Sequence, residues 1–231
     1  MKTYLVGEEL PEKYRKTLLE FGRVVVLPRS EATKAPTGTH PDALVGVVGD
    51  EIFVPKNETS VSCALTDAGI SHTVSVRESG EKYPDDCAVN FFTVGKFFVA
   101  KTDTVAPEAL ISSARQGFQI VDVKQGYAHC ATAVVSGGVV TADAGIYRAL
   151  SDRGVPSLLV KAGGVSLPPY EYGFIGGASG MIDDKTILFF GSLDTHPSGN
   201  EIRAFLSSLG ARIVEGDGDL SDHGGFIALD T

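Results

Sequence analysis

Apolar runs and short amphipathic segments alternate along the whole chain, and a glycine follows each amphipathic segment. Helical spacing is clearest in residues 200–209, where Ile202, Phe205 and Leu206 fall on one face. The run after each glycine is short and rich in β-branched residues, which is typical of a strand. The five glycines are Gly22, Gly69, Gly117, Gly154 and Gly210. This pattern predicts a helix, a glycine cap and a strand, repeated five times.

A β-hairpin is predicted before each helix. Residues 131–135 and 139–142 flank Ser136, Gly137 and Gly138, which is a strong signal for a tight turn. The other predicted pairs are 44–48 with 52–54, 88–93 with 97–100, 180–182 with 186–190, and 226–229 with 4–6. The last pair joins the two ends of the chain, so we expect an α/β fold that closes into a ring. The expected ring is a five-bladed, pseudo-fivefold α/β propeller of ββαβ repeats, the fifth repeat shared by the N- and C-termini.

The spacing of the glycines, 47, 48, 37 and 56 residues, suits an array of one supersecondary unit. We expect a single domain over residues 1–231, because this length suits one hydrophobic core. The approximate repeats are 29–76, 77–123, 124–160 and 161–215, with the fifth made of 216–231 plus 1–28. Asp143 directly precedes a predicted helix and is expected to be its N-cap.

Composition limits the partners that the chain is expected to have. A formal net charge of −9 argues against a nucleic-acid partner, and no apolar stretch reaches the length of a membrane span. The cysteines are Cys63, Cys87 and Cys130, an odd number without C-x-x-C spacing. They predict a reducing compartment, hence a cytoplasmic location, and argue against a disulfide framework. A homodimer through the rim of helices remains open.

Two segments resemble the pentein superfamily of guanidino-group-modifying enzymes. Residues 82–99 resemble a core repeat of the dimethylarginine dimethylaminohydrolases, and residues 40–48 resemble the strand that supplies their guanidinium-binding carboxylate. The resemblance, which extends to the amidinotransferases, implies that a guanidino or amino-acid-like small molecule binds at the central axis. The chain is also similar in size to the ribosome anti-association factors, which share this fold without catalytic residues. A non-catalytic scaffold is therefore the alternative.

Polar residues gather where the first strand of each unit is expected to start, and these positions face the axis in the resembled fold. The expected cation ligands are Asp42, Asp85 and Asp86, and the backbone of Gly176 and Gly177 is expected to bind an anionic group. The remaining expected ligand-binding residues are Asn90, Tyr127 and Ser179. His129 and His223 are the expected catalytic proton carriers, with Asp222 beside them. The alternative is that these residues belong to ordinary exposed loops.

The resemblance fails at one important position. The superfamily carries its nucleophilic cysteine near the C-terminus, whereas residues 220–229 contain no cysteine. Hydrolysis would therefore follow a route without that thiol. Cys130 is predicted to be a small core residue, since its neighbour His129 should point to the opposite face.

No cofactor is expected from the sequence. One alternative stays open, which is a divalent metal bound where several strand starts converge. The residues of that cluster would be His40, Asp42, Asp85, Asp86, His129, Asp222 and His223.

Overall fold

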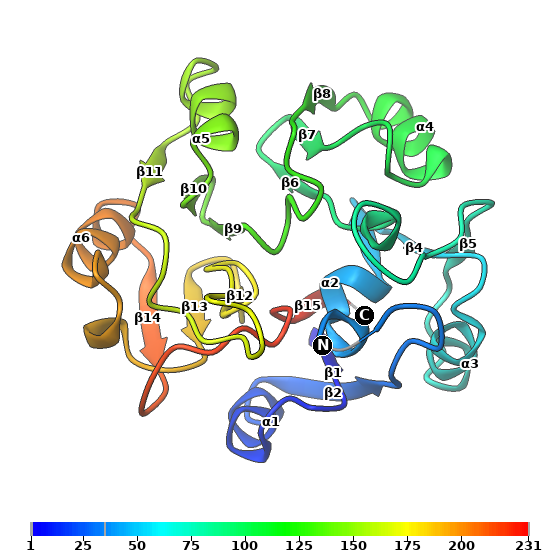
Figure 1. Ribbon diagram of the computed structural model, residues 1–231, viewed down its shortest axis with the longest axis horizontal. Helices are drawn as coiled ribbons and strands as arrows, with labels where there is room; N and C mark the ends of the chain where they lie inside the picture. Colours follow the sequence, from blue (N-terminus) through cyan, green and yellow to red (C-terminus); the bar gives the residue numbers. More distant parts are fainter. Residues whose placement is uncertain (1, 35, 231) are drawn as a thin grey trace.

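The computed structural model describes residues 2–34 and 36–230, so positions 1, 35 and 231 of the predicted repeats lie outside the described residues. The described chain has a mixed α/β fold built on five small sheets of three strands each (Figure 1). In every sheet the middle strand pairs antiparallel with one neighbour and parallel with the other. A helix lies between the two parallel strands in the sequence.

The sheets follow one another along the chain. Their strands are β3 (Gly46–Val48), β4 (Glu51–Val54) and β5 (Thr73–Val74); β6 (Phe92–Val94), β7 (Phe97–Ala100) and β8 (Gln119–Asp122); β9 (Thr132–Val135), β10 (Gly138–Thr141) and β11 (Ser157–Leu159); β12 (Ser179–Met181), β13 (Thr186–Phe189) and β14 (Arg212–Glu215); and β15 (Ile227–Asp230), β1 (Lys2–Gly7) and β2 (Gly22–Leu27). The connecting helices are α1 (Glu12–Leu19), α3 (Thr59–Asp67), α4 (Pro107–Arg115), α5 (Ala144–Ser151) and α6 (Gly199–Ser208).

One sheet contains both ends of the described chain. Strand β1 pairs antiparallel with β15, with Lys2 opposite Asp230, and parallel with β2. An ion pair of 2.9 Å joins Lys2 Nζ to Asp230 Oδ1 at this end of the sheet. The predicted pairing of residues 226–229 with 4–6 is therefore present, with slightly longer strands.

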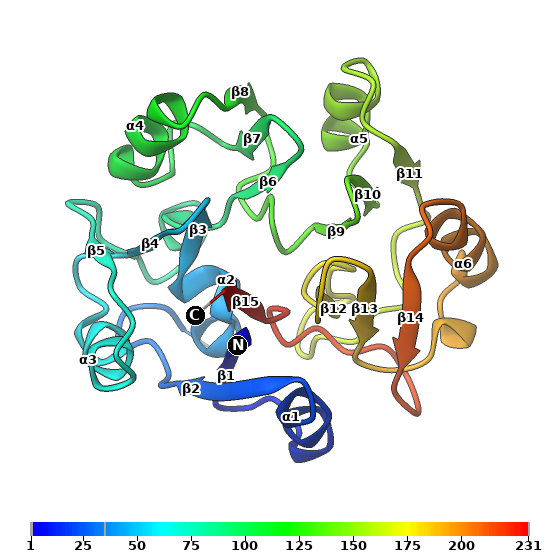
Figure 2. The same cartoon turned by 180° about the vertical axis from the view of Figure 1, so that it is seen from behind.

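The five helices lie at the periphery and the first strand of each unit lies nearer the centre, in views from both sides (Figures 1 and 2). Neighbouring units touch through these first strands, because β3 contacts β6, and β12 contacts both β9 and β15. The middle strands β7, β10 and β13 are buried at every position. The core thus lies within and between the units. No helix among the described residues is both long and apolar enough to span a bilayer.

The predicted glycine caps are confirmed at four positions of five. Gly69, Gly117, Gly154 and Gly210 have φ angles of +75°, +82°, +78° and +72°, the left-handed region that glycine adopts most readily. Gly22 differs because it begins β2, where an added Cβ would lie 2.3 Å from the carbonyl oxygen of Lys2. The predicted N-cap is confirmed, since the Asp143 side chain accepts the N–H of Ile146 at 2.8 Å.

The segments expected to start the first strands are not strands. Helix α2 (Pro41–Leu44) replaces the beginning of the first predicted hairpin, because proline at the first position of a helix already has the required φ. The 3-10 helix η2 (Asp85–Cys87) occupies the corresponding place in the next unit. Residues 128–131 form a turn before β9. Turns and single helical turns therefore carry the polar side chains to the centre.

Candidate functional site

Aromatic side chains surround a cavity of about 250 Å³, named here the aromatic pocket. It is lined by Thr37, His40, Tyr83, Tyr127, Cys130, Leu167, Tyr170, Tyr172, Phe174 and Asp222. The rings of Tyr83 and Tyr127 pack with their centroids 5.4 Å apart, and Tyr127 packs on Phe174 at 6.1 Å. Among the expected ligand-binding residues, Tyr127 is thus in the wall of a cavity.

Three polar side chains from three different units meet in the lining of this pocket. His40 Nδ1 lies 3.6 Å from Asp222 Oδ1, and Cys130 Sγ lies 4.0 Å from each of those two atoms. The exposed fractions of His40, Cys130 and Asp222 are 3%, 2% and 4%. Cys130 was predicted to be an ordinary core residue; it is buried, but it also faces the cavity.

Backbone contacts hold the Asp222 carboxylate in place. Oδ2 accepts the N–H of Phe174 at 2.8 Å, and Oδ1 accepts the N–H of Gly224 at 3.0 Å. Gly177 packs directly against this carboxylate, since an added Cβ would lie 1.9 Å from Oδ1. The segment from Phe174 to Gly177 and the segment after Asp222 therefore fix the carboxylate between them.

Asp42 lies beside this group, and one of its two carboxylate oxygens is unsatisfied. Its exposed fraction is 2%, and Oδ1 has no hydrogen-bond partner. Burial and the negative charge of Asp222 raise the pKa of Asp42 well above its usual range. Hydrogen bonds from the side chains of Cys130 and Asn90 act in the opposite direction, but the desolvation of the buried charge outweighs them. The expected cation ligand is thus buried as a poorly compensated acid.

The thiol and the imidazole nearest to these carboxylates are held in their neutral forms. Burial raises the pKa of the Cys130 thiol, and the charges of Asp222 and Asp42 raise it further. Burial lowers the pKa of His40, although Asp222 acts in the opposite direction. At neutral pH, burial therefore favours the thiol form of Cys130 over the thiolate, and the neutral imidazole of His40 over the imidazolium.

The two other expected carboxylates, Asp85 and Asp86, lie in different environments. Asp86 is buried, accepts the hydroxyl of Tyr127 at 2.5 Å, and has a pKa raised by burial. Asp85, its neighbour on η2, is exposed. Asn90 is fully buried and uses its amide to join backbone segments, donating to the carbonyl oxygen of Asp42. The structure thus places Asp86 next to the pocket wall and Asp85 at the surface.

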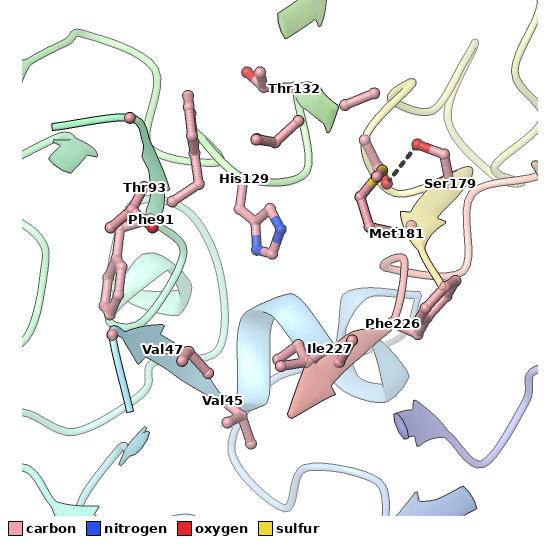
Figure 3. A pocket seen from close by; sticks show the side chains of 18 of the residues that line it. Val45, Val47, Phe91, Thr93, His129, Thr132, Ser179, Met181, Phe226 and Ile227 are labelled. Atoms are coloured by element: carbon pink, nitrogen blue, oxygen red, sulfur yellow. Dashed lines mark hydrogen bonds between the residues drawn. The ribbon is translucent and has the colours of Figure 1, made fainter. Parts of the chain in front are cut away.

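His129 points into a second pocket (Figure 3), a mostly apolar cavity of about 440 Å³. Val45, Phe91, Met181 and Phe226 are among the residues around it (Figure 3). Burial lowers the pKa of His129 to about 4. As predicted, His129 and Cys130 face different ways, since only Cys130 lines the aromatic pocket. His129 is therefore not brought together with Asp222.

His223 and Ser179 also lie outside the aromatic pocket. His223 lines a small neighbouring cavity with Glu9 and His40, and burial lowers its pKa to about 4. Its ring lies edge-on to Phe190, with centroids 5.6 Å apart. Ser179 lines the second pocket and donates its hydroxyl to the carbonyl oxygen of Ile175 at 2.8 Å.

The glycine pair expected to bind an anion packs against carbonyl groups instead. The N–H of Gly177 donates to the carbonyl oxygen of Cys130 at 3.0 Å. An added Cβ on Gly176 would lie 2.3–2.6 Å from the carbonyl oxygens of His129, Thr132 and Cys130. The glycines are required because the chain passes so close to this turn, and the Gly177 N–H is already used.

The structure corrects the predicted site in two ways. It joins Asp222 to His40, which was predicted only as a ligand of the alternative metal cluster, and to Cys130, which was predicted to be a core residue. It also separates His129 and Asp85 from the predicted metal cluster and brings His40 and Asp222 together. The dipeptide that precedes Asp42, His40–Pro41, was the only local signal for His40, because it lies within the Pro-Asp segment that suggested the fold.

Comparison with solved structures shows the pentein fold. The N-terminal domain of ArgZ, an arginine dihydrolase from the ornithine-ammonia cycle in Cyanobacteria, aligns with a TM-score of 0.60 and 11% identity, covering 94% of this chain and 90% of that one. A longer ArgZ chain, crystallised in its apo form, aligns with a TM-score of 0.50 and 13% identity. The alignment covers 94% of this chain but only 36% of the ArgZ chain.

Two further structures support the same fold. DDAH from Pseudomonas aeruginosa, in complex with citrulline, has a TM-score of 0.53 and 10% identity, with 98% of each chain covered. SxtG, an amidinotransferase of the saxitoxin biosynthetic pathway from Microseira wollei, has a TM-score of 0.52 and 10% identity, covering 93% of this chain and 88% of that one.

Comparison of the sequence gives fewer matches than comparison of the structure. No curated protein matches this sequence significantly. A family model does match, over residues 5–227, which is nearly the whole chain. The chain therefore belongs to the family of unknown function DUF6873.

Proposed function

We propose that this protein binds a small organic cation of the guanidino or amidino class in the aromatic pocket. Asp222 faces the cation, and the bound cation favours ionisation of the neighbouring Asp42. The observation that carries this proposal is the buried Asp42 carboxylate, whose Oδ1 has no partner and which lies close to a second buried carboxylate.

The charge around the pocket is unbalanced. Buried carboxylates in proteins are normally paired with a cation or fully hydrogen-bonded. Among the described residues, Asp222 has His40 as its only ion-pair partner, and burial lowers the pKa of this histidine. Asp42 has no ion pair within the same residues. No lysine or arginine of the described chain reaches either acid. A bound cation would stabilise both acids in their charged forms.

The walls of the pocket suit a planar cation. Cations are attracted to the faces of aromatic rings, and a guanidinium group can also donate two parallel hydrogen bonds to one carboxylate. Tyr83, Tyr127, Tyr170, Tyr172 and Phe174 supply the aromatic rings. A cavity of about 250 Å³ is at the small end of ligand sites, so the ligand would be about the size of an amino acid.

The structural neighbours support this ligand class, because their names include an arginine dihydrolase, an amidinotransferase and a citrulline complex of DDAH. We also propose that the five units close into one pseudo-fivefold domain over residues 1–231, with the pocket at its axis. The pairing of β1 with β15 supports closure. A cytoplasmic location is part of the proposal, and the three free cysteines favour a reducing compartment.

Hydrolysis of the bound cation would be a second step, separate from binding. The segment from Leu220 to Leu229 has no thiol, so chemistry there would use Asp222 or His223 instead. His223 lines the adjoining cavity rather than the aromatic pocket, and burial lowers its pKa to about 4, which favours the neutral form that a proton acceptor needs.

The test is calorimetric titration of the purified protein with arginine, agmatine and guanidinium. We expect at least one of them to bind, and Asp42→Asn to weaken binding by about 30-fold or more, because a buried charge loses its partner. Asp85→Asn is the matched control, since Asp85 is an exposed carboxylate close in sequence to the pocket wall. Equal affinity in the Asp42→Asn variant would refute the proposal. Failure of all three ligands would favour the alternative, a non-catalytic scaffold.

A further inference from the structure

Three donor atoms of different chemistry converge on one point beside the aromatic pocket. His40 Nδ1, Cys130 Sγ and Asp222 Oδ1 all lie within 4.8 Å of one another, and all three residues are buried. They come from the segments that precede α2, β9 and β15, so folding of three separate units brings them together. A nitrogen, a thiol sulfur and a carboxylate oxygen form a donor set that zinc prefers.

The distances between the three donor atoms are slightly longer than those between the ligands of a bound zinc ion. Ligand atoms placed about 2.0–2.3 Å from a tetrahedral zinc ion lie roughly 3.3–3.8 Å from one another. The observed separations are 3.6 Å between nitrogen and oxygen and 4.0 Å from sulfur to each of them. Shifts of a few tenths of an ångström would bring all three atoms into coordination.

The same geometry argues against a Cys-His-Asp catalytic triad. A triad uses one ring nitrogen of histidine for the nucleophile and the other for the carboxylate. Here the Nδ1 atom of His40 faces both Cys130 and Asp222. One nitrogen cannot donate to the carboxylate and accept the thiol proton at the same time. Convergence on a single point is what a shared metal ion requires.

Charge balance at the three ligands suits a divalent ion. A dication bound by the Cys130 thiolate and the Asp222 carboxylate gives a neutral group. The His40 imidazole is an appropriate third ligand, because histidine coordinates metals in its neutral form.

We propose that His40, Cys130 and Asp222 bind a zinc ion whose fourth coordination position opens into the aromatic pocket. All three residues line that pocket, so a molecule inside it can reach the ion. Zinc with three protein ligands and one open position can polarise a bound group or activate a water molecule. Binding of the thiolate releases the Cys130 proton to solvent. The site does not depend on the guanidino proposal, since zinc alone is its ligand.

The test is titration of the metal-free protein with Zn²⁺ by calorimetry, and with Co²⁺ by absorption spectroscopy. We expect one tight site per chain and the near-ultraviolet charge-transfer band of a cobalt–thiolate bond. Cys130→Ser and His40→Gln should each weaken zinc binding by about 100-fold or more, since even outer contacts of a metal site contribute 10–100-fold. Cys63→Ser is the matched control because Cys63 is exposed, and it should leave both signals unchanged.

Absence of a tight zinc site in the folded wild-type protein would overturn the proposal. A cobalt–thiolate band that disappears in Cys63→Ser but persists in Cys130→Ser would also overturn it. If the Cys130 variant does not fold, His40→Gln decides the question. It should weaken zinc binding without removing any thiol, and unchanged zinc affinity in that variant would contradict the site.

Discussion

The side chain of Asn90 donates from Nδ2 to the carbonyl oxygen of Asp42 at 3.1 Å, which ties the second unit to the first. Its Oδ1 atom meanwhile accepts the N–H groups of His129 and Cys130 at 2.8 and 3.2 Å. One buried amide thus sets the positions of two residues next to the aromatic pocket. It was predicted to bind the ligand, and its amide groups are instead occupied by the backbone.

Replacement of this amide should be costly. Asn90→Ala leaves two buried N–H groups and one carbonyl oxygen without their partners, and each such group costs about 1–3 kcal/mol. We expect the free energy of unfolding to fall by about 3–5 kcal/mol, measured by urea denaturation. Asn200→Ala is the control, since Asn200 is exposed on α6. A loss below 1 kcal/mol for Asn90→Ala would show that water satisfies these groups.

Asp42 should destabilise the protein that has no bound cation. Its pKa is raised on folding, so the folded state retains a proton that the unfolded state has released. Stability therefore decreases as the pH rises from the ordinary aspartate range through the raised pKa. We expect Asp42→Asn to be more stable than wild type by about 1–3 kcal/mol at pH 8 in chelator, with a smaller difference at pH 5. Denaturation curves at the two pH values test this, and a difference that grows at pH 5 would contradict it.

His129 and His223 should make the protein sensitive to acid. Both have pKa values lowered to about 4 by burial, below the unfolded value of about 6.5. Their contribution to stability is complete above the unfolded value and is lost as the pH falls towards 4. His129→Gln should therefore lose about 1–2 kcal/mol less than wild type between pH 7 and pH 5. Equal losses in the two proteins, measured in denaturant, would mean that His129 is not desolvated in solution.

The hydroxyl of Tyr127 should contribute measurably to the fold, unlike that of Tyr83. Tyr127→Phe removes the donor to the buried Asp86 carboxylate and should cost about 1–3 kcal/mol. Tyr83 packs on the same ring, is 47% exposed and donates no hydrogen bond among the described residues, so Tyr83→Phe should be nearly neutral. Thermal unfolding of the two variants compares them directly. Similar melting temperatures would show that Asp86 finds another donor.

The architecture could be predicted because its signals are local and repeated. A left-handed glycine after a helix, such as Gly117 or Gly210, is a property of the backbone at that position, and so is the capping aspartate Asp143. The starts of the first strands were predicted less well. Pro41 begins a helical turn there, and strand-like composition in residues 88–91 did not lead to strand pairing.

The site could be predicted only in part. Asp42, Asp222 and Tyr127 stood out by residue type, and the structure places all three in or beside the aromatic pocket. The role of Cys130 depends on its distance from His40, which is 90 residues away in the sequence, and periodicity carries no information about such a contact. His129 was predicted to act with Asp222, but its side chain direction is set by the turn before β9, which points it into the other pocket.

The sheet built from β15, β1 and β2 also constrains how the chain is made. A ribosome synthesises β1 and β2 early, and their parallel pairing can form as soon as β2 has emerged. The other edge of β1 must then wait, with its N–H and C=O groups unpaired, until the remaining units and β15 emerge from the exit tunnel. An unpaired edge strand is a template for association with other chains. Until β15 has been made, this edge of β1 is therefore a place where the nascent chain can associate with other chains.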